Sequence, residues 1–181
     1  MAIKKFEFTD EVNSQGLRRI RALIDIPSLG VSKGNLGGFL EKEDNLSHEG
    51  SCWISDNACI EGNARIWGNA RISGDARIEG DACIWGNARI MGNARIMGNA
   101  RISDNAVISK AQDYLTASPV GSENGVLTVF RTPKGVSVTR GCFEGTLEAF
   151  EDAVKTKHKG TQYETEYLTL INYIKNRFGV L

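Results

Sequence analysis

The chain of 181 residues has only three prolines and two histidines, and no excess of charge of either sign. Its 22 basic and 22 acidic side chains cancel, which argues against a protein that coats DNA or RNA or binds a membrane through a polybasic surface. No run of about 18 apolar residues occurs, so we expect no segment that spans a bilayer. The first residues, MAIKKFEFTDEV, turn acidic where a signal peptide is apolar, so we expect a cytoplasmic protein.

The four cysteines show no metal-binding or disulfide pattern. No CxxC pair occurs, and the spacing is not that of a dense disulfide framework. We therefore predict reduced thiols in packing or surface positions, and we expect no metal and no cofactor. The cysteines are Cys52, Cys59, Cys83 and Cys142.

Twenty glycines against three prolines indicate a repeat, and the middle of the chain contains one. Isoleucine recurs every six residues from Ile54 to Ile108, with alanine two residues before it in nearly every unit. Period six and a glycine in most units exclude a helix, and collagen needs glycine at every third residue. Ala and Ile at i and i+2 of a short strand point inward, and Gly with Asn or Asp suits a tight corner. The pattern predicts a β-solenoid.

The outward residues repeat better with a period of 18 than of six, so three units close one coil. Those that follow isoleucine run Ser, Glu, Trp from Ser55 and again from Ser73. On these unbroken units, residues 54–109 resemble the left-handed parallel β-helix of the hexapeptide-repeat superfamily. The resemblance implies a mainly β fold, a short left-handed parallel β-helix of about three to four coils. So short a column is expected to need caps and to form oligomers.

The repeat divides the chain into three predicted parts. Residues 1–53 are expected to form an N-terminal strand, suggested by alternation from Ile20 to Ile26, and an irregular capping coil in which Leu40 and Leu46 keep the spacing of six. The left-handed β-helix covers residues 54–110, and residues 111–181 form a small α+β module.

The α+β module is predicted to contain a hairpin and two helices. GVLTVFR and GVSVTRGCF flank the turn sequence TPKG and are typical of a β-hairpin. Thr146 can cap a helix that ends near Gly160, and a last helix carries an apolar stripe from Tyr163 to Phe178.

Almost the whole chain resembles a family of proteins common in bacteriophages and prophages. The matching segments are NLGGFLEKEDNLSHEG, the GNARI array, SPVGSENG, GCFEGTLEAFEDAVKTKH and the segment from Tyr163 to Tyr167. The resemblance implies a phage accessory protein and specifies no reaction.

The alternative enzymatic function is that of a hexapeptide acyltransferase that uses acyl-CoA. Such enzymes resemble this array, but they place a catalytic histidine beside the coils and eject a loop from them. Here only His48 and His158 are available, both outside the uninterrupted array, and His48 has no evident orienting partner in the sequence. A zinc carbonic anhydrase of this fold needs three histidine ligands. We therefore expect a protein that is not an enzyme.

Outward ladders on the solenoid give the first candidate ligand site. One face aligns Trp67 with Trp85 beside arginines, and a second aligns Arg71 with Arg89. Stacked like charges repel unless water, a carboxylate or an anion lies between them. Two interpretations stay open: subunit packing with solvated arginines, or a flat anionic ligand held by Trp and Arg. The candidates are Arg65, Trp67, Arg71, Trp85, Arg89 and Arg101.

The segment SPVGSENG and the arginines after it give a second candidate site. Small residues and backbone amides there can cradle a phosphate, although an ordinary strand connection has the same composition. The candidates are Ser122, Asn124, Arg131 and Arg140, with Lys134 nearby.

Three function classes follow from these observations. The first is a non-catalytic, homotrimeric protein, phage-encoded as the resemblance implies, that sequesters a small anionic ligand such as a cyclic nucleotide signal of host defence. The second is the acyltransferase, and the third is a purely structural or protein-binding scaffold. We expect the first, with the protein itself and the small ligand as partners.

Overall fold

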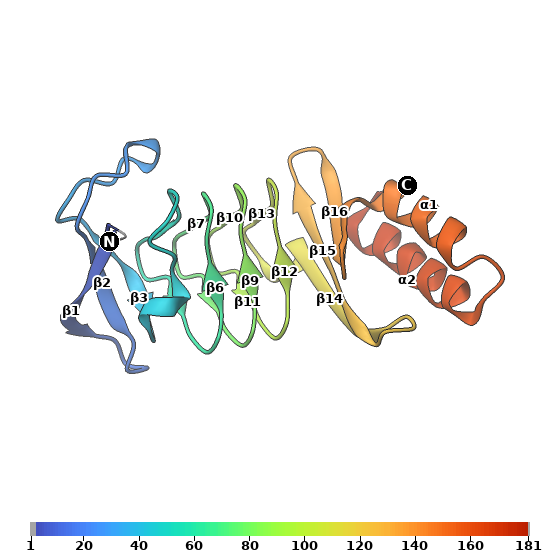
Figure 1. Ribbon diagram of the computed structural model, residues 1–181, viewed down its shortest axis with the longest axis horizontal. Helices are drawn as coiled ribbons and strands as arrows, with labels where there is room; N and C mark the ends of the chain where they lie inside the picture. The colour runs from blue at the N-terminus through green and yellow to red at the C-terminus, as the bar shows by residue number, and fades with distance from the viewer. Residues whose placement is uncertain (1–2, 181) are drawn as a thin grey trace. The chain divides into compact units, whose positions relative to one another are not determined.

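The computed structural model describes residues 3–180 and divides into two compact units, an N-terminal unit that ends at Ala111 and a C-terminal unit that begins at Gln112 (Figure 1). The N-terminal unit contains the repeat, and the C-terminal unit is an α+β domain. None of the helices within residues 3–180 is both long and apolar enough to cross a membrane.

The N-terminal unit begins with an antiparallel cap. Strands β1 (Phe6–Val12), β2 (Arg18–Ala22) and β3 (Leu36–Leu40) pair in that order, and β3 then pairs in parallel with the repeat. The expected strand up to Ile26 is too long, because β2 ends at Ala22 and the chain leaves the sheet before a 3₁₀ turn (Pro27–Leu29). The irregular first coil is present, since Leu40 pairs with Ile60 and Leu46 with Ile66.

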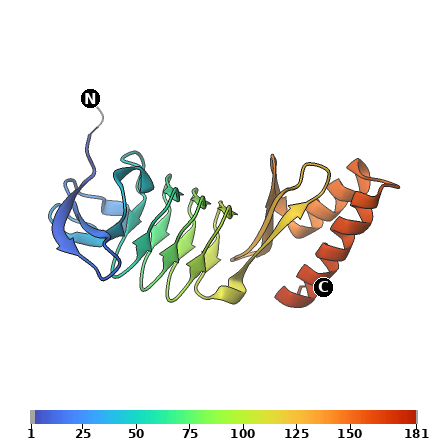
Figure 2. The ribbon, with the colours of Figure 1, turned by 90° about the horizontal axis from the view of Figure 1, so that it is seen from below.

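The repeat is a parallel β-solenoid of about four turns, with three sheets around one core (Figure 2). Partners in neighbouring turns are 18 residues apart, as the outward pattern predicts. One sheet stacks β3, β5, β8 and β11, a second stacks β4, β7, β10 and β13, and a third stacks β6, β9 and β12. The strands are β4 (Trp53–Ile54), β5 (Cys59–Ile60), β6 (Arg65–Ile66), β7 (Arg71–Ile72), β8 (Arg77–Ile78), β9 (Cys83–Ile84), β10 (Arg89–Ile90), β11 (Arg95–Ile96), β12 (Arg101–Ile102) and β13 (Val107–Ile108).

The solenoid core consists of alanine and isoleucine rungs. Every alanine and isoleucine of the array from Ile54 to Ile108 is at most 1% exposed, which confirms the inward phase predicted from the sequence. Each enclosed isoleucine contributes roughly 1.5–3 kcal/mol by leaving water. Burial along this column therefore stabilises the coils.

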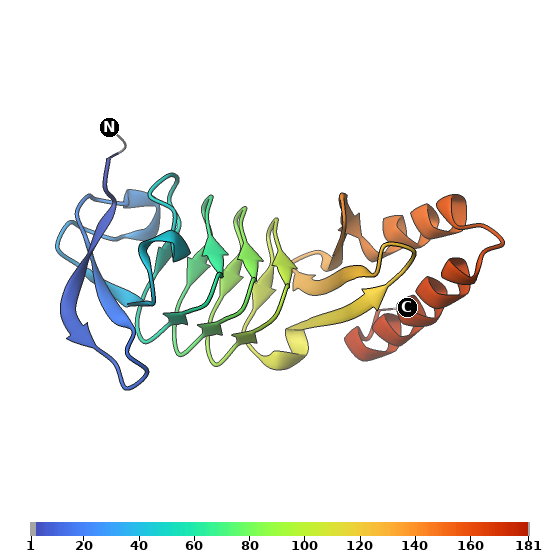
Figure 3. The ribbon, with the colours of Figure 1, turned by 60° about the horizontal axis from the view of Figure 1, so that its bottom comes forward.

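Figure 3 shows the coils stacked along the solenoid, and glycine corners and side-chain amide ladders set the spacing between them. Gly62 has φ +67°, and a Cβ there would lie 2.9 Å from the carbonyl oxygen of Gly80 in the next coil. Beside it, the Asn63 side-chain amide donates to Asp81 at 3.0 Å. Glycine suits this corner because it adopts a positive φ without strain and has no Cβ to meet the next coil, whereas Asp56 and Asp104 adopt a similar φ (+57° and +53°) at two other corners.

The C-terminal unit is a four-stranded antiparallel sheet with two helices. The sheet order is β14 (Tyr114–Val120), β15 (Gly125–Thr132), β16 (Gly135–Arg140) and β17 (Phe143–Thr146). Helices α1 (Leu147–Lys157) and α2 (Gln162–Phe178) pack on one face of it through an apolar cluster. As predicted, the Thr146 hydroxyl caps α1 by accepting a hydrogen bond from the Ala149 N–H at 3.2 Å.

The predicted hairpin is only the centre of this sheet. Residues Ser118–Val120 of the expected phosphate-cradling loop belong to strand β14, so only residues 121–124 form the connection. Pro119 is compatible with the strand because β14 lies at the edge of the sheet, where a missing N–H is tolerated.

Candidate functional site

The predicted tryptophan ladder is present on the face formed by β6, β9 and β12. The rings of Trp67 and Trp85 stack with centroids 5.2 Å apart and planes 5° from parallel. Arg65, Cys83 and Arg101 align beside them in register. Since the two rings cover one face of each other, only their outer faces and edges can contact another molecule.

The second pair of predicted solenoid arginines lies on a different face. Arg71 pairs in register with Arg89 on the sheet of β4, β7, β10 and β13. The Arg71 guanidinium donates to the carbonyl oxygen of Ser28 at 2.6 Å, so it fastens the N-terminal loop. The six solenoid candidates are therefore divided between two faces and do not form one site.

The C-terminal unit contains a cavity of about 320 Å³, which we call the C-terminal pocket. It lies where the turn after β14, the turn after β16 and both helices meet. Its wall combines aromatic rings with cationic side chains, a composition that suits a flat anionic molecule. Its lining includes Ser122, Glu123, Arg140, Cys142, Phe143, Phe150, Lys157, His158 and Tyr167.

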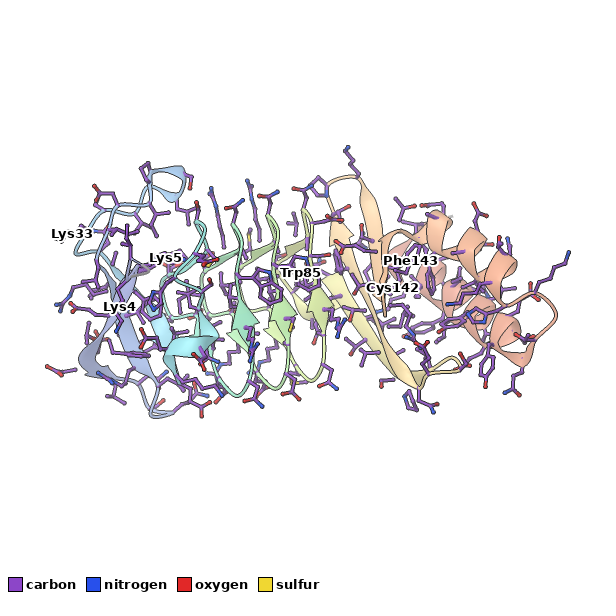
Figure 4. All side chains as sticks on the ribbon, viewed as in Figure 1. Lys4, Lys5, Lys33, Trp85, Cys142 and Phe143 are labelled. Atoms are coloured by element: carbon purple, nitrogen blue, oxygen red, sulfur yellow. The ribbon has the colours of Figure 1, made fainter. Side chains whose placement is uncertain are left out.

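The aromatic wall comes from three elements. Phe143, labelled in Figure 4, lies at the start of β17. Its ring packs on that of Phe150 of α1 with centroids 5.1 Å apart. Phe150 meets Tyr167 of α2 edge to face at 5.6 Å, and the His158 ring lies 5.4 Å from Tyr167. Phe150 and Tyr167 are also core residues, so the hydrophobic cluster fixes the wall.

Arg140 is held in place beside the pocket. One terminal nitrogen, Nη2, donates to the Val120 carbonyl at 2.8 Å, and Nη1 lies 3.7 Å from a Glu123 carboxylate oxygen. The Arg140 side chain is 10% exposed, and its buried Nε has no hydrogen-bond partner among residues 3–180. Gly125 makes room for the guanidinium, because a Cβ there would lie 2.6 Å from Nη1.

The pocket brings together only two of the four candidates predicted for the C-terminal unit, Ser122 and Arg140. Asn124 occupies the turn with φ +47° and does not line the pocket. Arg131 donates to the Phe178 carbonyl at 3.0 Å and lies 3.5 Å from Asp113. Arg131 therefore fastens the end of α2.

His48 has the orienting partner that the sequence did not reveal. Its Nδ1 accepts a hydrogen bond from the Lys5 backbone N–H at 3.1 Å, and its Nε2 lies 2.8 Å from the Glu43 carboxylate. Phe6 stacks on the ring at 4.5 Å. Hydrogen bonds from His48 and then Lys4 lower the pKa of Glu43. Both ring nitrogens of His48 thus hold the N-terminal cap.

Sequence reasoning found Arg140 but missed the aromatic residues of the pocket and its other two basic residues, Lys157 and His158. Phe150 and Tyr167 lie on the apolar stripes predicted for the two helices, where they look like ordinary core residues. Lys157 lies in the last turn of α1, where a cation also suits the helix dipole. Only the spatial approach of β17 to both helices reveals that they share a cavity.

Comparison with known proteins bears on the repeat. The family described as YdcK beta solenoid repeat matches residues 64–80 and 70–84. The repeat is a β-solenoid. No curated protein matches the chain. The family match covers a short part of the solenoid, and the C-terminal pocket lies outside it. Within residues 3–180, no group of three or more His, Cys, Asp or Glu side chains is arranged to hold a metal ion.

Proposed function

We propose that this protein is a non-catalytic binding protein and that the C-terminal pocket holds a small, flat, anionic ligand. The observation that carries the proposal is the meeting of Arg140, Lys157 and His158 with an aromatic wall in one cavity. Aromatic rings favour a planar apolar group, and guanidinium and ammonium groups favour phosphate oxygens.

The ion pair of Arg140 explains how an anion enters. Glu123, the acidic partner of Arg140, has a side chain that is 76% exposed, and the separation of 3.7 Å is long for a hydrogen bond. Because water solvates the Glu123 carboxylate, this long contact holds it only weakly to Arg140. A phosphate can therefore displace Glu123 from Nη1 while Nη2 keeps its bond to Val120.

A nucleotide-like molecule is the ligand class we favour. A cavity of about 320 Å³ is at the lower end of the range for small-molecule sites, so it suits one base and one phosphate of a larger nucleotide whose remaining part stays outside. The resemblance to phage proteins supports a use in the host cytosol, where the protein would sequester a nucleotide signal of host defence. Sequestration needs tight binding and several sites but no chemistry.

We further propose that the protein assembles as a homotrimer through the solenoid, which would provide three pockets per particle. Trp67 is 37% and Met97 52% exposed, and aromatic and methionine side chains are enriched in interface cores. The exposed solenoid residues on their own would equally suit a purely structural or protein-binding scaffold that holds no ligand.

The direct test is to identify what the purified protein releases on heating. We expect mass spectrometry to find a chemically unchanged anionic molecule in stoichiometric amount. The exposed thiol of Cys142 lines the same pocket, so the bound ligand should slow its alkylation while Cys83, on the solenoid, reacts at an unchanged rate. If no molecule is released and no nucleotide slows the alkylation of Cys142, the pocket is not a nucleotide site. The protein would then be a structural or protein-binding scaffold.

A further inference from the structure

Lys5 lies fully buried in the N-terminal unit, with its amine against a buried thiol. Its Nζ is 3.1 Å from the Sγ of Cys52, which is also fully buried. The other two contacts of Nζ are with the carbonyl oxygens of Glu49 and Gly50, both at 3.4 Å. Figure 4 labels Lys5 in this unit.

These contacts leave the Lys5 nitrogen poorly compensated. An ammonium group taken out of water needs strong acceptors around it, and an unpaired one costs several kcal/mol. Here the closest acceptor is a sulfur, which accepts weakly, and both carbonyls lie at the long limit of a hydrogen bond. No carboxylate contacts Nζ among residues 3–180. The amine and the thiol therefore lie within bonding reach of each other, with no strong acceptor between them.

We propose that Lys5 and Cys52 form a covalent modification site, in which dioxygen joins them through an N–O–S bridge. From neutral amine and thiol, one N–H bond, the S–H bond and the O–O bond break, while one N–O and one S–O bond form. One oxygen atom remains in the bridge, and the other leaves as water with the two hydrogens. The amine and the thiol are oxidised, and dioxygen is reduced.

Enclosure favours this product over other thiol oxidations. Glutathione cannot reach a fully buried Cys52, whereas dioxygen is small and apolar enough to enter a protein interior. The bridged nitrogen resembles that of a hydroxylamine and is only weakly basic. The crosslinked site therefore holds no ammonium group in the interior.

The bridge would fasten the N-terminal cap to the first coil. Lys5 precedes β1 and Cys52 precedes β4, and 47 positions separate them in the sequence. A crosslink across such a span restricts the unfolded chain, as a disulfide does. We expect the bridged protein to unfold at a temperature several degrees above that of the reduced protein.

The test compares full-length protein kept in air with protein prepared without oxygen. We expect a mass gain of about 14 Da in air, reversed by dithiothreitol. Peptide mapping should locate it in a linked pair of peptides that contain residues 5 and 52. Lys5→Met and Cys52→Ala should abolish the gain, whereas Cys59→Ala, which removes another buried cysteine, should retain it.

Peptide mapping of the wild-type protein tests for the bridge even if both variants fail to fold. A Cys52 that stays alkylatable after long exposure to air would overturn the proposal. So would a sulfenic or sulfinic acid at Cys52 without a link to Lys5, or a mass loss of about 2 Da from a direct N–S bond.

Discussion

The indole ring of Trp67 lies 5.2 Å from that of Trp85 and nearly parallel to it, although 18 positions separate the two residues. This spacing is that of neighbouring strands in a sheet, so the stack reports the register of the solenoid. The same register brings identical positions of every third repeat into contact. It therefore determines which side chains are buried and which form an exposed ladder.

Assembly is the first prediction that follows from the exposed ladder. We expect a trimer in light scattering at micromolar concentration, with a contact that includes the face of Trp67 and Trp85 or the face of Met97. Trp67→Glu should weaken the trimer if the tryptophan face takes part, and Arg65→Glu tests the rim of the same face. A monomeric wild-type protein would contradict the prediction.

The solenoid core gives a second prediction. Ile78 is fully enclosed by the coils on either side, so Ile78→Asp buries a carboxylate without a partner. We expect a loss of about 4 kcal/mol or more, enough to prevent folding. Arg77→Asp changes the neighbouring outward position and should fold. An Ile78→Asp variant that melts within a degree or two of the wild type would show that the inward phase is wrong.

The solenoid could be predicted from the sequence because every repeat unit has the same pattern of inward alanine and isoleucine and a glycine-containing corner. Ile54 to Ile108 fix the inward phase, and the period of 18 places Trp67 on Trp85 without further information. The edge strands of the C-terminal sheet, β14 and β17, have no repeated sequence pattern that would reveal them. Pro119 in β14 and Gly145 in β17 obscure strands that are stabilised by pairing with β15 and β16.

The pocket could be predicted only in part, because its residues meet through tertiary packing. Arg131 and Arg140 look equivalent in the sequence, yet one stacks on Phe178 and the other lies beside the pocket. Phe143 and Tyr167 come from different elements, and neither local spacing nor composition indicates that they share a wall.

Acid should weaken the N-terminal cap. The pKa of Glu43 is lowered by its hydrogen bonds to His48 and Lys4. A lowered folded pKa contributes stability above the unfolded value, about 4.5, and that stability is lost as the pH falls through the lower folded value. Melting curves should therefore show a smaller loss of stability for Glu43→Gln than for wild type between about pH 6 and about pH 3. Asp44→Asn, on the same turn, is the control. An identical acid profile for Glu43→Gln and wild type would contradict this role.

Acyl transfer is a reaction we expect the protein not to perform. Both nitrogens of His48 are engaged, so neither is available as a general base. Incubation with acetyl-CoA and a panel of amines and alcohols should release no free thiol. Any release that His48→Gln abolishes in a folded variant would overturn the non-enzymatic assignment.

Glu123 should act as a competitor for the ligand. Its carboxylate pairs with Arg140 at 3.7 Å, and the exposed side chain can change without disturbing the fold. We expect Glu123→Gln to tighten binding of a phosphate ligand about threefold, because the phosphate no longer competes with a carboxylate for Nη1 of Arg140. Glu148→Gln, on the exposed side of α1, should have no effect. Weaker binding by Glu123→Gln would mean that the carboxylate contacts the ligand directly.

Calorimetry against cyclic dinucleotides, cyclic trinucleotides and ADP-ribose derivatives tests the central claim most directly. We predict heat of binding for at least one of them, weakened roughly ten- to a hundredfold by Arg140→Gln or Lys157→Gln and unchanged by Lys159→Gln. Lys157 is exposed, so its variant remains informative if Arg140→Gln misfolds. Two results would contradict a ligand in the C-terminal pocket. One is the absence of binding heat for every member of the panel. The other is a wild-type affinity in both Lys157→Gln and Arg140→Gln when both variants are folded.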